Sequence, residues 1–208
     1  MTKSNMDLYL EYINKRGSCL SVFRAIADKY ELKSGIYPGS YIHITPSLCL
    51  SEMYYVDSDK KAIAFFKHQN DIEAYLDKNK CYTTAFDFQF EGADFTKPLG
   101  AKRGYYDLMI SLYSGFISLH CKDYLRKGGV LLANDSHGDA TLAFYDPDYA
   151  FIGVLVESEK GIEISGDTLD RYFKMKSEKK VDLDKVKKQM KGPNYRNQVE
   201  YYLFQKKV

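Results

Sequence analysis

The sequence predicts a Rossmann-like, doubly wound α/β fold, with a mostly parallel sheet, an antiparallel edge and helices on both faces. Strand-like and helix-like segments alternate along the 208 residues. Two segments, YDLMISL and VLLAN, are almost wholly apolar, as expected for strands buried on both faces. Between residues 34 and 66 a strand, a glycine turn, a second strand ending in an acid, and a helix follow one another. That order is typical of a nucleotide-binding βαβ unit.

The first 100 residues are predicted to begin with helices. Apolar residues recur at helical intervals over 5–30, and Gly17-Ser18 divides this stretch into two helices. Thr45-Pro46 offers an N-cap followed by proline at the first helical position. The predicted elements are a strand at about 35–41, a helix from Thr45-Pro46, a strand at 53–56, helices at 60–66 and 71–76, and a strand at 83–90.

The remaining residues continue the α/β alternation. Arg126-Lys127-Gly128-Gly129 is interpreted as a cationic helix end with a glycine C-cap. The predicted elements are a strand at 106–112, a helix at 116–125, strands at 130–134, 149–157 and 161–165, a helix at 182–190, a turn at 192–194 and a strand at 200–205. The last strands suit an antiparallel edge. We expect a helical cover at 1–33 and one Rossmann-like domain at 34–208.

Composition excludes several classes of protein. A hydrophobic content of 45% indicates a folded domain rather than a disordered chain. The net charge of +2 gives no overall attraction to nucleic acid or membranes. Four scattered cysteines without a CxxC pair indicate a reduced, cytoplasmic protein rather than a zinc site or disulfide framework. Neither a signal peptide nor a membrane-spanning apolar stretch is expected.

A glycine turn and an acid form the first candidate site. In the turn YPGSY, Gly39 lets the backbone approach a ligand, although a single glycine is as readily a plain turn. Asp57 follows 18 residues later at a strand end, where a carboxylate can accept both hydroxyls of a ribose. Asp59 is interpreted as the N-cap of the next helix. Asp94 is either near an adenine amino group or a solvated loop acid.

The segment NDSHGD, directly after the strand at 130–134, is the second candidate site. His137 could act as a general base, oriented by Asp135 or Asp139. The same side chains could instead bind a cation. A turn rich in Asn, Asp, Ser and Gly is the alternative without function.

Together these segments resemble the class I S-adenosylmethionine-dependent methyltransferases. The matching segments are YPGSY, YYVDSD, GADF, YDLMISLYSG and YLRKGGVLLAND, over roughly residues 34–157. The resemblance implies a seven-stranded sheet and S-adenosylmethionine as cofactor, bound over the strand ends. It places seven residues in the cofactor site: Tyr37, Gly39, Ser40, Tyr41, Asp57, Asp94 and Ser111. It places Tyr113 and His137 near the substrate, as the catalytic candidates.

The chain departs from the family pattern at two positions. Tyr37 stands where the family has an acid, and Tyr41 stands where it has a second glycine. A tyrosine ring there either stacks on the cofactor or fills its pocket. The sequence therefore predicts a methyltransferase of unknown substrate, with a non-catalytic nucleotide- or partner-binding module as the alternative. Metal-assisted hydrolysis at 135–139 ranks last, and no metal site is assigned.

A lysine-rich stretch at 174–191 is the remaining feature. Its eight lysines against three acids could contact nucleic acid phosphates. A solvated helix face is preferred, because arginine is absent from the stretch and aromatic residues are few. The expected substrate is a small molecule or is unknown.

Overall fold

The computed structural model describes residues 4–159, 161–178 and 180–208. The chain divides into two compact units, residues 1–100 and residues 101–208. Three strands lie in the first unit and five in the second, with helices in both. The predicted α/β class is confirmed, with eight strands in the described residues instead of seven. No helix among these residues has the length and apolar character needed to cross a membrane.

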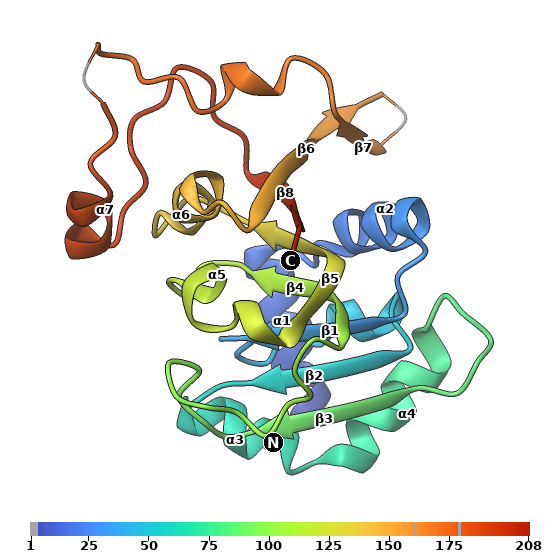
Figure 1. Cartoon of the computed structure of the whole chain (residues 1–208). Helices are drawn as coiled ribbons and strands as arrows, with labels where there is room; N and C mark the ends of the chain where they lie inside the picture. Colours follow the sequence, from blue (N-terminus) through green and yellow to red (C-terminus); the bar gives the residue numbers. More distant parts are fainter. Residues whose placement is uncertain (1–3, 160, 179) are drawn as a thin grey trace. The chain divides into compact units, whose positions relative to one another are not determined.

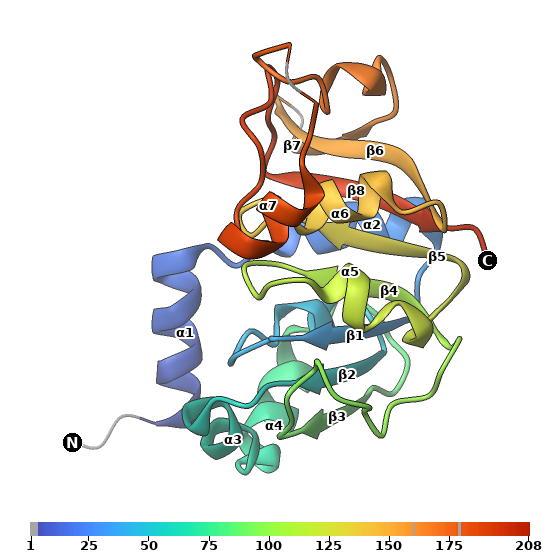
Figure 2. The same cartoon turned by 60° about the vertical axis from the view of Figure 1, so that its left-hand side comes forward.

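The first unit carries three parallel strands and the N-terminal helices (Figure 1). Its elements are α1 (Asn5–Arg16), α2 (Leu20–Tyr30), β1 (Ser34–Pro38), η1 (Thr45–Leu48), β2 (Glu52–Val56), α3 (Lys60–Phe66), α4 (Gln69–Asn79) and β3 (Asp87–Glu91). β1 pairs with β2 from Ser34 opposite Glu52, and β2 pairs with β3 from Glu52 opposite Asp87. Figures 1 and 2 both show the three strands side by side.

Local signals explain the helices of this unit. Ser4 and Asp7 form a reciprocal capping box at the start of α1. α2 buries one apolar face, made of Val22, Phe23, Ile26 and Ala27. Asp59 caps α3 by accepting a hydrogen bond from the Lys61 amide at 2.7 Å, as predicted.

The predicted helix at Thr45-Pro46 is wrong. The segment forms only the four-residue 3₁₀ turn η1. The Thr45 hydroxyl does not cap a helix, because it lies 2.7 Å from the Tyr9 hydroxyl in the core. The preceding strand also ends at Pro38 instead of Tyr41, because Gly39 and Tyr41 take positive φ angles of 68° and 49°.

The second unit combines one parallel strand pair with an antiparallel edge. Its elements are β4 (Tyr106–Ser111), α5 (Ile117–His120), η2 (Lys122–Tyr124), β5 (Leu125–Ala133), α6 (Asp139–Tyr145), β6 (Tyr149–Ser158), β7 (Gly161–Ser165), η3 (Leu169–Arg171), α7 (Leu183–Gln189) and β8 (Tyr201–Lys206). β4 and β5 are parallel. β8 pairs antiparallel with β5 and β6, and β7 pairs antiparallel with β6. Figures 1 and 2 show β5, β8 and β6 as neighbours.

The helix predicted at 116–125 is largely wrong. Only Ile117–His120 is α-helical, and Arg126 to Gly129 lie inside β5 rather than at a helix end. Arg126 is held in the strand by Asp107, with Nε 2.6 Å from Oδ1. Gly128, at φ 75°, accommodates an irregular stretch where the register between β4 and β5 shifts.

Candidate functional site

Asp57 is the central residue of the first unit's candidate site. It follows β2 at the edge where the parallel strands β1, β2 and β3 have their C-terminal ends. Its Oδ2 accepts a hydrogen bond from the Tyr41 amide at 2.7 Å, and its Oδ1 accepts one from the Asp59 amide at 2.7 Å. A carboxylate has about four acceptor positions. Asp57 therefore retains acceptor capacity for a vicinal diol such as that of a ribose.

The glycine turn is closed against β2. The amides of Gly39 and Ser40 both donate to the Val56 carbonyl, at 2.7 and 3.2 Å. The following amide, that of Tyr41, is the one bound to Asp57. The turn and the acid thus form one hydrogen-bonded assembly, and Asp57 lies directly against the turn.

An aromatic cluster covers this turn. The Tyr12 ring, from α1, lies 5.5 Å from the rings of both Tyr41 and His43. His43 is buried, and its ring nitrogens contact the Ser18 carbonyl at 3.0 Å and the Tyr37 hydroxyl at 3.3 Å. Burial lowers the pKa of His43 to about 4. His43 is therefore neutral at physiological pH and serves packing.

Asp94 follows β3 at the same edge of the unit. It is exposed, and its Oδ1 accepts hydrogen bonds from the amide and hydroxyl of Thr96 at 2.9 and 2.7 Å. This is a local Asx-type turn.

In the second unit, the polar side chains after β4 and β5 form a separate network. Asn134 is 5% exposed, and its Oδ1 accepts from the Ser136 hydroxyl at 2.9 Å and from the Tyr113 amide at 3.4 Å. The Ser136 hydroxyl also lies 3.1 Å from Nδ1 of His137. The Tyr113 backbone N–H can only donate, so the side-chain oxygen of Asn134, and not its nitrogen, must face it. Its Nδ2 is then a buried donor without a hydrogen-bond partner among the described residues.

Tyr113 has a strained backbone and a fixed hydroxyl. Its φ of 59° is left-handed, which is uncommon for a bulky residue. Its ring is 57% exposed, and its hydroxyl donates to Glu200 Oε1 at 2.7 Å. Such strain at a strand end is a reason to test the residue for function.

The two aspartates do not orient His137, so that expectation is wrong. Asp139 is fully buried and accepts from the Ser111 and Ser118 hydroxyls, each at 2.5 Å. Asp135 accepts from the Thr141 amide and hydroxyl at 2.8 and 2.9 Å. Burial raises the pKa of each carboxyl to about 6. Both acids brace the start of α6, and Ser136 is the neighbour of His137 instead.

The cation site considered at 135–139 is not assembled either. Within residues 4–159, 161–178 and 180–208, no three His, Cys, Asp or Glu side chains gather closely enough to hold a metal ion. Ser111, a candidate for the cofactor site, is buried and tied to Asp139.

Comparisons with known proteins bear on the fold. A scan against protein-family models found no match, and neither did a sequence search of curated proteins. A protein assigned as an O-methyltransferase from Klebsiella pneumoniae superposes with a TM-score of 0.54 at 9% identity, covering 100% of this chain and 92% of that chain. The chain has the methyltransferase fold.

Two further structures agree with this. A protein assigned as a caffeoyl-CoA O-methyltransferase from Staphylococcus aureus matches with a TM-score of 0.52 at 12% identity, over 79% of this chain and 93% of that chain. An O-methyltransferase from Bacillus cereus, in complex with SAH, matches with a TM-score of 0.50 at 10% identity, over 79% and 90%. The resemblance seen in the sequence is thereby confirmed at the level of the methyltransferase fold.

Sequence reasoning missed Asn134 and Ser136 as parts of the second network. Both lie in the NDSHGD segment, beside acids and a histidine whose side chains are the more usual catalytic groups. An asparagine directly after the last residue of a buried strand is the signal that marks Asn134.

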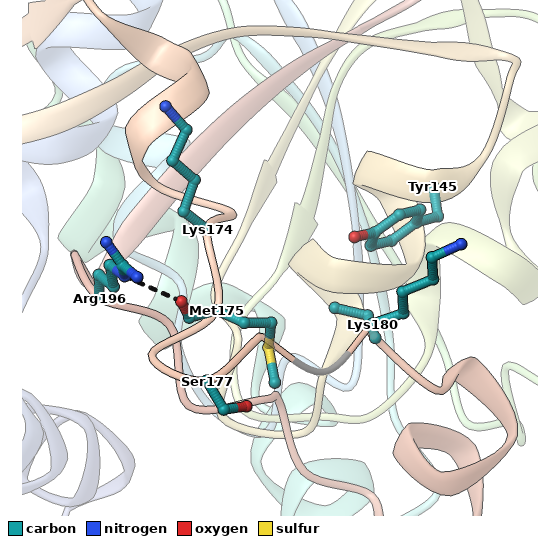
Figure 3. Close-up of a pocket in the computed structure, with 7 residues that line it drawn as sticks. Tyr145, Lys174, Met175, Ser177, Lys180 and Arg196 are labelled. Carbon is teal, nitrogen blue, oxygen red and sulfur yellow. Dashed lines mark hydrogen bonds between the residues drawn. The ribbon is translucent and has the colours of Figure 1, made fainter.

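A pocket of about 510 Å³ lies elsewhere in the second unit (Figure 3). It is lined by Tyr145, Lys174, Met175, Ser177, Lys180, Val181 and Arg196. Figure 3 shows Tyr145 and Lys180 on one side and Met175 and Arg196 on the other, with Arg196 Nε donating to the Met175 carbonyl at 3.0 Å. Lys174 is paired with Asp170 at 2.9 Å. Lys180 and Arg196 are the other cationic residues of the lining.

Proposed function

We propose that this chain is an S-adenosylmethionine-dependent methyltransferase acting on a small molecule. The observation that carries the proposal is Asp57, at the C-terminal end of β2 and bonded to the glycine turn. In open α/β sheets this is where a carboxylate receives a ribose. The methyltransferase fold supports the choice of cofactor, and one of the similar structures, that from Bacillus cereus, is a complex with SAH.

In this proposal the first unit holds the cofactor. Asp57 accepts the ribose hydroxyls, Asp94 faces the adenine side, and the turn at Gly39 and Ser40 supports the remainder. Tyr41 and Tyr37 shape the space beside it. α1 and α2, the helical part of residues 1–33, act as a cover, which is supported by the Tyr12 ring lying against Tyr41.

His137 and Tyr113 are the groups proposed to act on the substrate. S-adenosylmethionine, when bound, supplies an electrophilic methyl group. His137 takes the proton of the attacking substrate atom, with Nδ1 placed by Ser136. Tyr113, whose hydroxyl is held by Glu200, positions the substrate, and Asn134 holds Ser136 and the Tyr113 amide in place. We place this reaction in the cytoplasm, a compartment that suits four cysteines without a disulfide between them.

The alternative is a non-catalytic module of the same fold. The packing of Tyr41 against Tyr12 favours it, because a filled turn leaves less space for the methionine part of the cofactor. A module of this kind would bind another nucleotide or a protein partner. The two proposals differ in whether S-adenosylmethionine binds at Asp57.

Substitution of Asp57 tests the proposal. Asp57→Ala should weaken S-adenosylmethionine binding by about 1–3 kcal/mol, through loss of charge-assisted hydrogen bonds to the ribose. Asp59→Ala is the matched control: it removes the cap of α3, so it should lower stability by about 1 kcal/mol and leave affinity unchanged. His137→Ala should also bind the cofactor normally. Equal affinity of wild type and Asp57→Ala in calorimetry would remove Asp57 from the site.

A further inference from the structure

Two of the four cysteines lie together in the first unit. Cys49 follows η1, and Cys81 lies two residues beyond the end of α4. The Cys81 amide donates to the Leu48 carbonyl at 2.8 Å, which places the backbones of the two cysteines side by side. Burial raises the pKa of the Cys49 thiol and the Cys81 side chain raises it further, so the two side chains lie close together. Cys81 is exposed and Cys49 is half-buried, so one thiol faces solvent and the other lies behind it.

A cation lies against the exposed thiol. Arg24 projects from α2 and places Nη2 2.9 Å from Sγ of Cys81. The thiolate is the form of cysteine that attacks peroxides, and a neighbouring guanidinium stabilises negative charge on sulfur. Reactive thiols are typically accessible, close to a positive charge and next to a second cysteine that completes the reaction. Arg24, Cys81 and Cys49 meet all three conditions.

We propose that Cys81 is a peroxide-reactive thiol and that Cys49 converts its product into a reversible disulfide. The Cys81 thiolate attacks one oxygen of hydrogen peroxide, the O–O bond breaks, and the departing hydroxide takes up a proton to become water. The Cys49 sulfur then attacks the sulfenic acid, the S–O bond breaks, and a second water leaves with the Cys49 proton. The two thiols lose two electrons in total, and the peroxide gains them.

The burial of Cys49 determines which of the two cysteines reacts with peroxide first. Burial raises the pKa of Cys49 to about 12, so Cys49 remains a thiol and does not compete for peroxide. The disulfide would join the end of η1 to the segment before β3. η1 is itself anchored, since the Ser47 hydroxyl bonds to Tyr55 and the Ser47 carbonyl accepts from Tyr82 at 2.8 Å. Oxidation would therefore fix the connection that carries Gly39 and Tyr41.

The test is peroxide treatment of the full chain, followed by alkylation of unreacted thiols in denaturant and peptide mass spectrometry. We expect one linked peptide pair, Cys49 with Cys81, lighter by two hydrogens and restored by dithiothreitol, while Cys19 and Cys121 are alkylated. Cys49→Ser should accumulate a sulfenic acid at Cys81 that dimedone traps. Cys81→Ser should leave Cys49 unoxidised.

Arg24 provides a quantitative control. Arg24→Gln should slow oxidation of Cys81 about fivefold, while Lys29→Gln, which removes the same charge from the same helix, should not. Circular dichroism verifies that each variant is folded. Two results would overturn the proposal. One is that Cys19 is oxidised as fast as Cys81. The other is that Cys49 and Cys81 are still free to be alkylated after peroxide treatment. Cys49, Cys81 and Arg24 are not among the residues assigned to the cofactor, so neither result decides whether S-adenosylmethionine binds.

Discussion

Tyr41 is the residue on which the geometry of the first site depends most. Its left-handed backbone, at φ 49°, accompanies the hydrogen bond from its amide to Asp57. A left-handed conformation costs roughly 1–2 kcal/mol for a residue with a Cβ and almost nothing for glycine. The ring recovers part of this cost by packing against Tyr12. A glycine at this position would form the same turn without the ring.

Substitutions at Tyr41 separate the backbone from the ring. Tyr41→Gly removes the strain together with the ring contact, so its unfolding free energy should stay within about 1 kcal/mol of wild type. Tyr41→Ala keeps the strain and loses the ring, so it should be about 1 kcal/mol less stable than Tyr41→Gly. Urea unfolding followed by circular dichroism measures both. An alanine variant at least as stable as the glycine variant would show that the turn is unstrained.

His43 makes stability depend on pH. Its pKa is lowered by burial from 6.5 to about 4, so between these values the unfolded chain binds the extra proton. The contribution of His43 to the free energy of unfolding is complete above pH 6.5. It decreases by up to about 3 kcal/mol as the pH falls toward 4. Asp135 and Asp139 act in the opposite direction, since raised carboxyl pKa values favour the folded state in acid.

The variant His43→Gln separates the pH dependence due to His43 from that due to the two aspartates. Asp135 and Asp139 contribute equally to wild type and to His43→Gln, so the difference between their unfolding free energies reports on His43 alone. The stability advantage of wild type over His43→Gln should decrease as the pH is lowered from 7 to 4. Parallel pH profiles of the two proteins would show that His43 titrates normally in the fold.

Among secondary-structure elements, the segment after α7 supports the loop that carries His137. A Cβ added at Gly192 would lie 2.1 Å from Oδ2 and 2.5 Å from the carbonyl oxygen of Asp135. Only glycine allows this approach. The network at Asn134 therefore depends on a segment some 55 residues later in the chain.

The corresponding prediction compares two glycines of the second unit. Gly192→Ala should destabilise the protein by about 1–3 kcal/mol, because backbone atoms must move apart. Gly166→Ala should change stability by less than about 0.5 kcal/mol, since its added Cβ meets only one carbonyl at 3.6 Å. Thermal unfolding of both variants gives the comparison. Equal midpoints would contradict the close approach at Gly192.

Element prediction from the sequence succeeded where a pattern extends over several turns or a whole buried strand. The helices α1 and α2 and the apolar strands β4 and β6 lie where their patterns place them. η1 and α5 failed because each is a single turn, and the core decides a single turn more than the local sequence does. Arg126 to Gly129 has the composition of a helix end, but the β4 pairs on either side of it, at Leu125 and Val130, and the ion pair of Arg126 with Asp107 hold it in a strand.

The candidate site shows the same division. Asp57 could be placed from the sequence because its position after β2 follows from strand order alone. The orientation of His137 could not, because Asp135 and Asp139 are drawn to Thr141 and to Ser111 by contacts that only the folded unit creates. The pair of Cys49 and Cys81 was invisible for the same reason, being 32 positions apart in the chain.

At the scale of the whole molecule, the methyltransferase fold persists at 9–12% identity in the structures compared. Few side chains are shared at that level, so the likeness reflects buried strands and their order more than any conserved motif. In this chain the position that matters is that of Asp57, an acid after β2 that is hydrogen-bonded to the glycine turn. The proposed activity rests on that position and on the cofactor fitting beside Tyr41.

Calorimetric titration of the full chain with S-adenosylmethionine and S-adenosylhomocysteine tests the central claim most directly. We predict saturable binding of both ligands at one site per chain, with a dissociation constant well below millimolar. Absence of binding at millimolar concentrations of either ligand would contradict the proposed methyltransferase, and the fold would then serve as a binding module closed by its tyrosines.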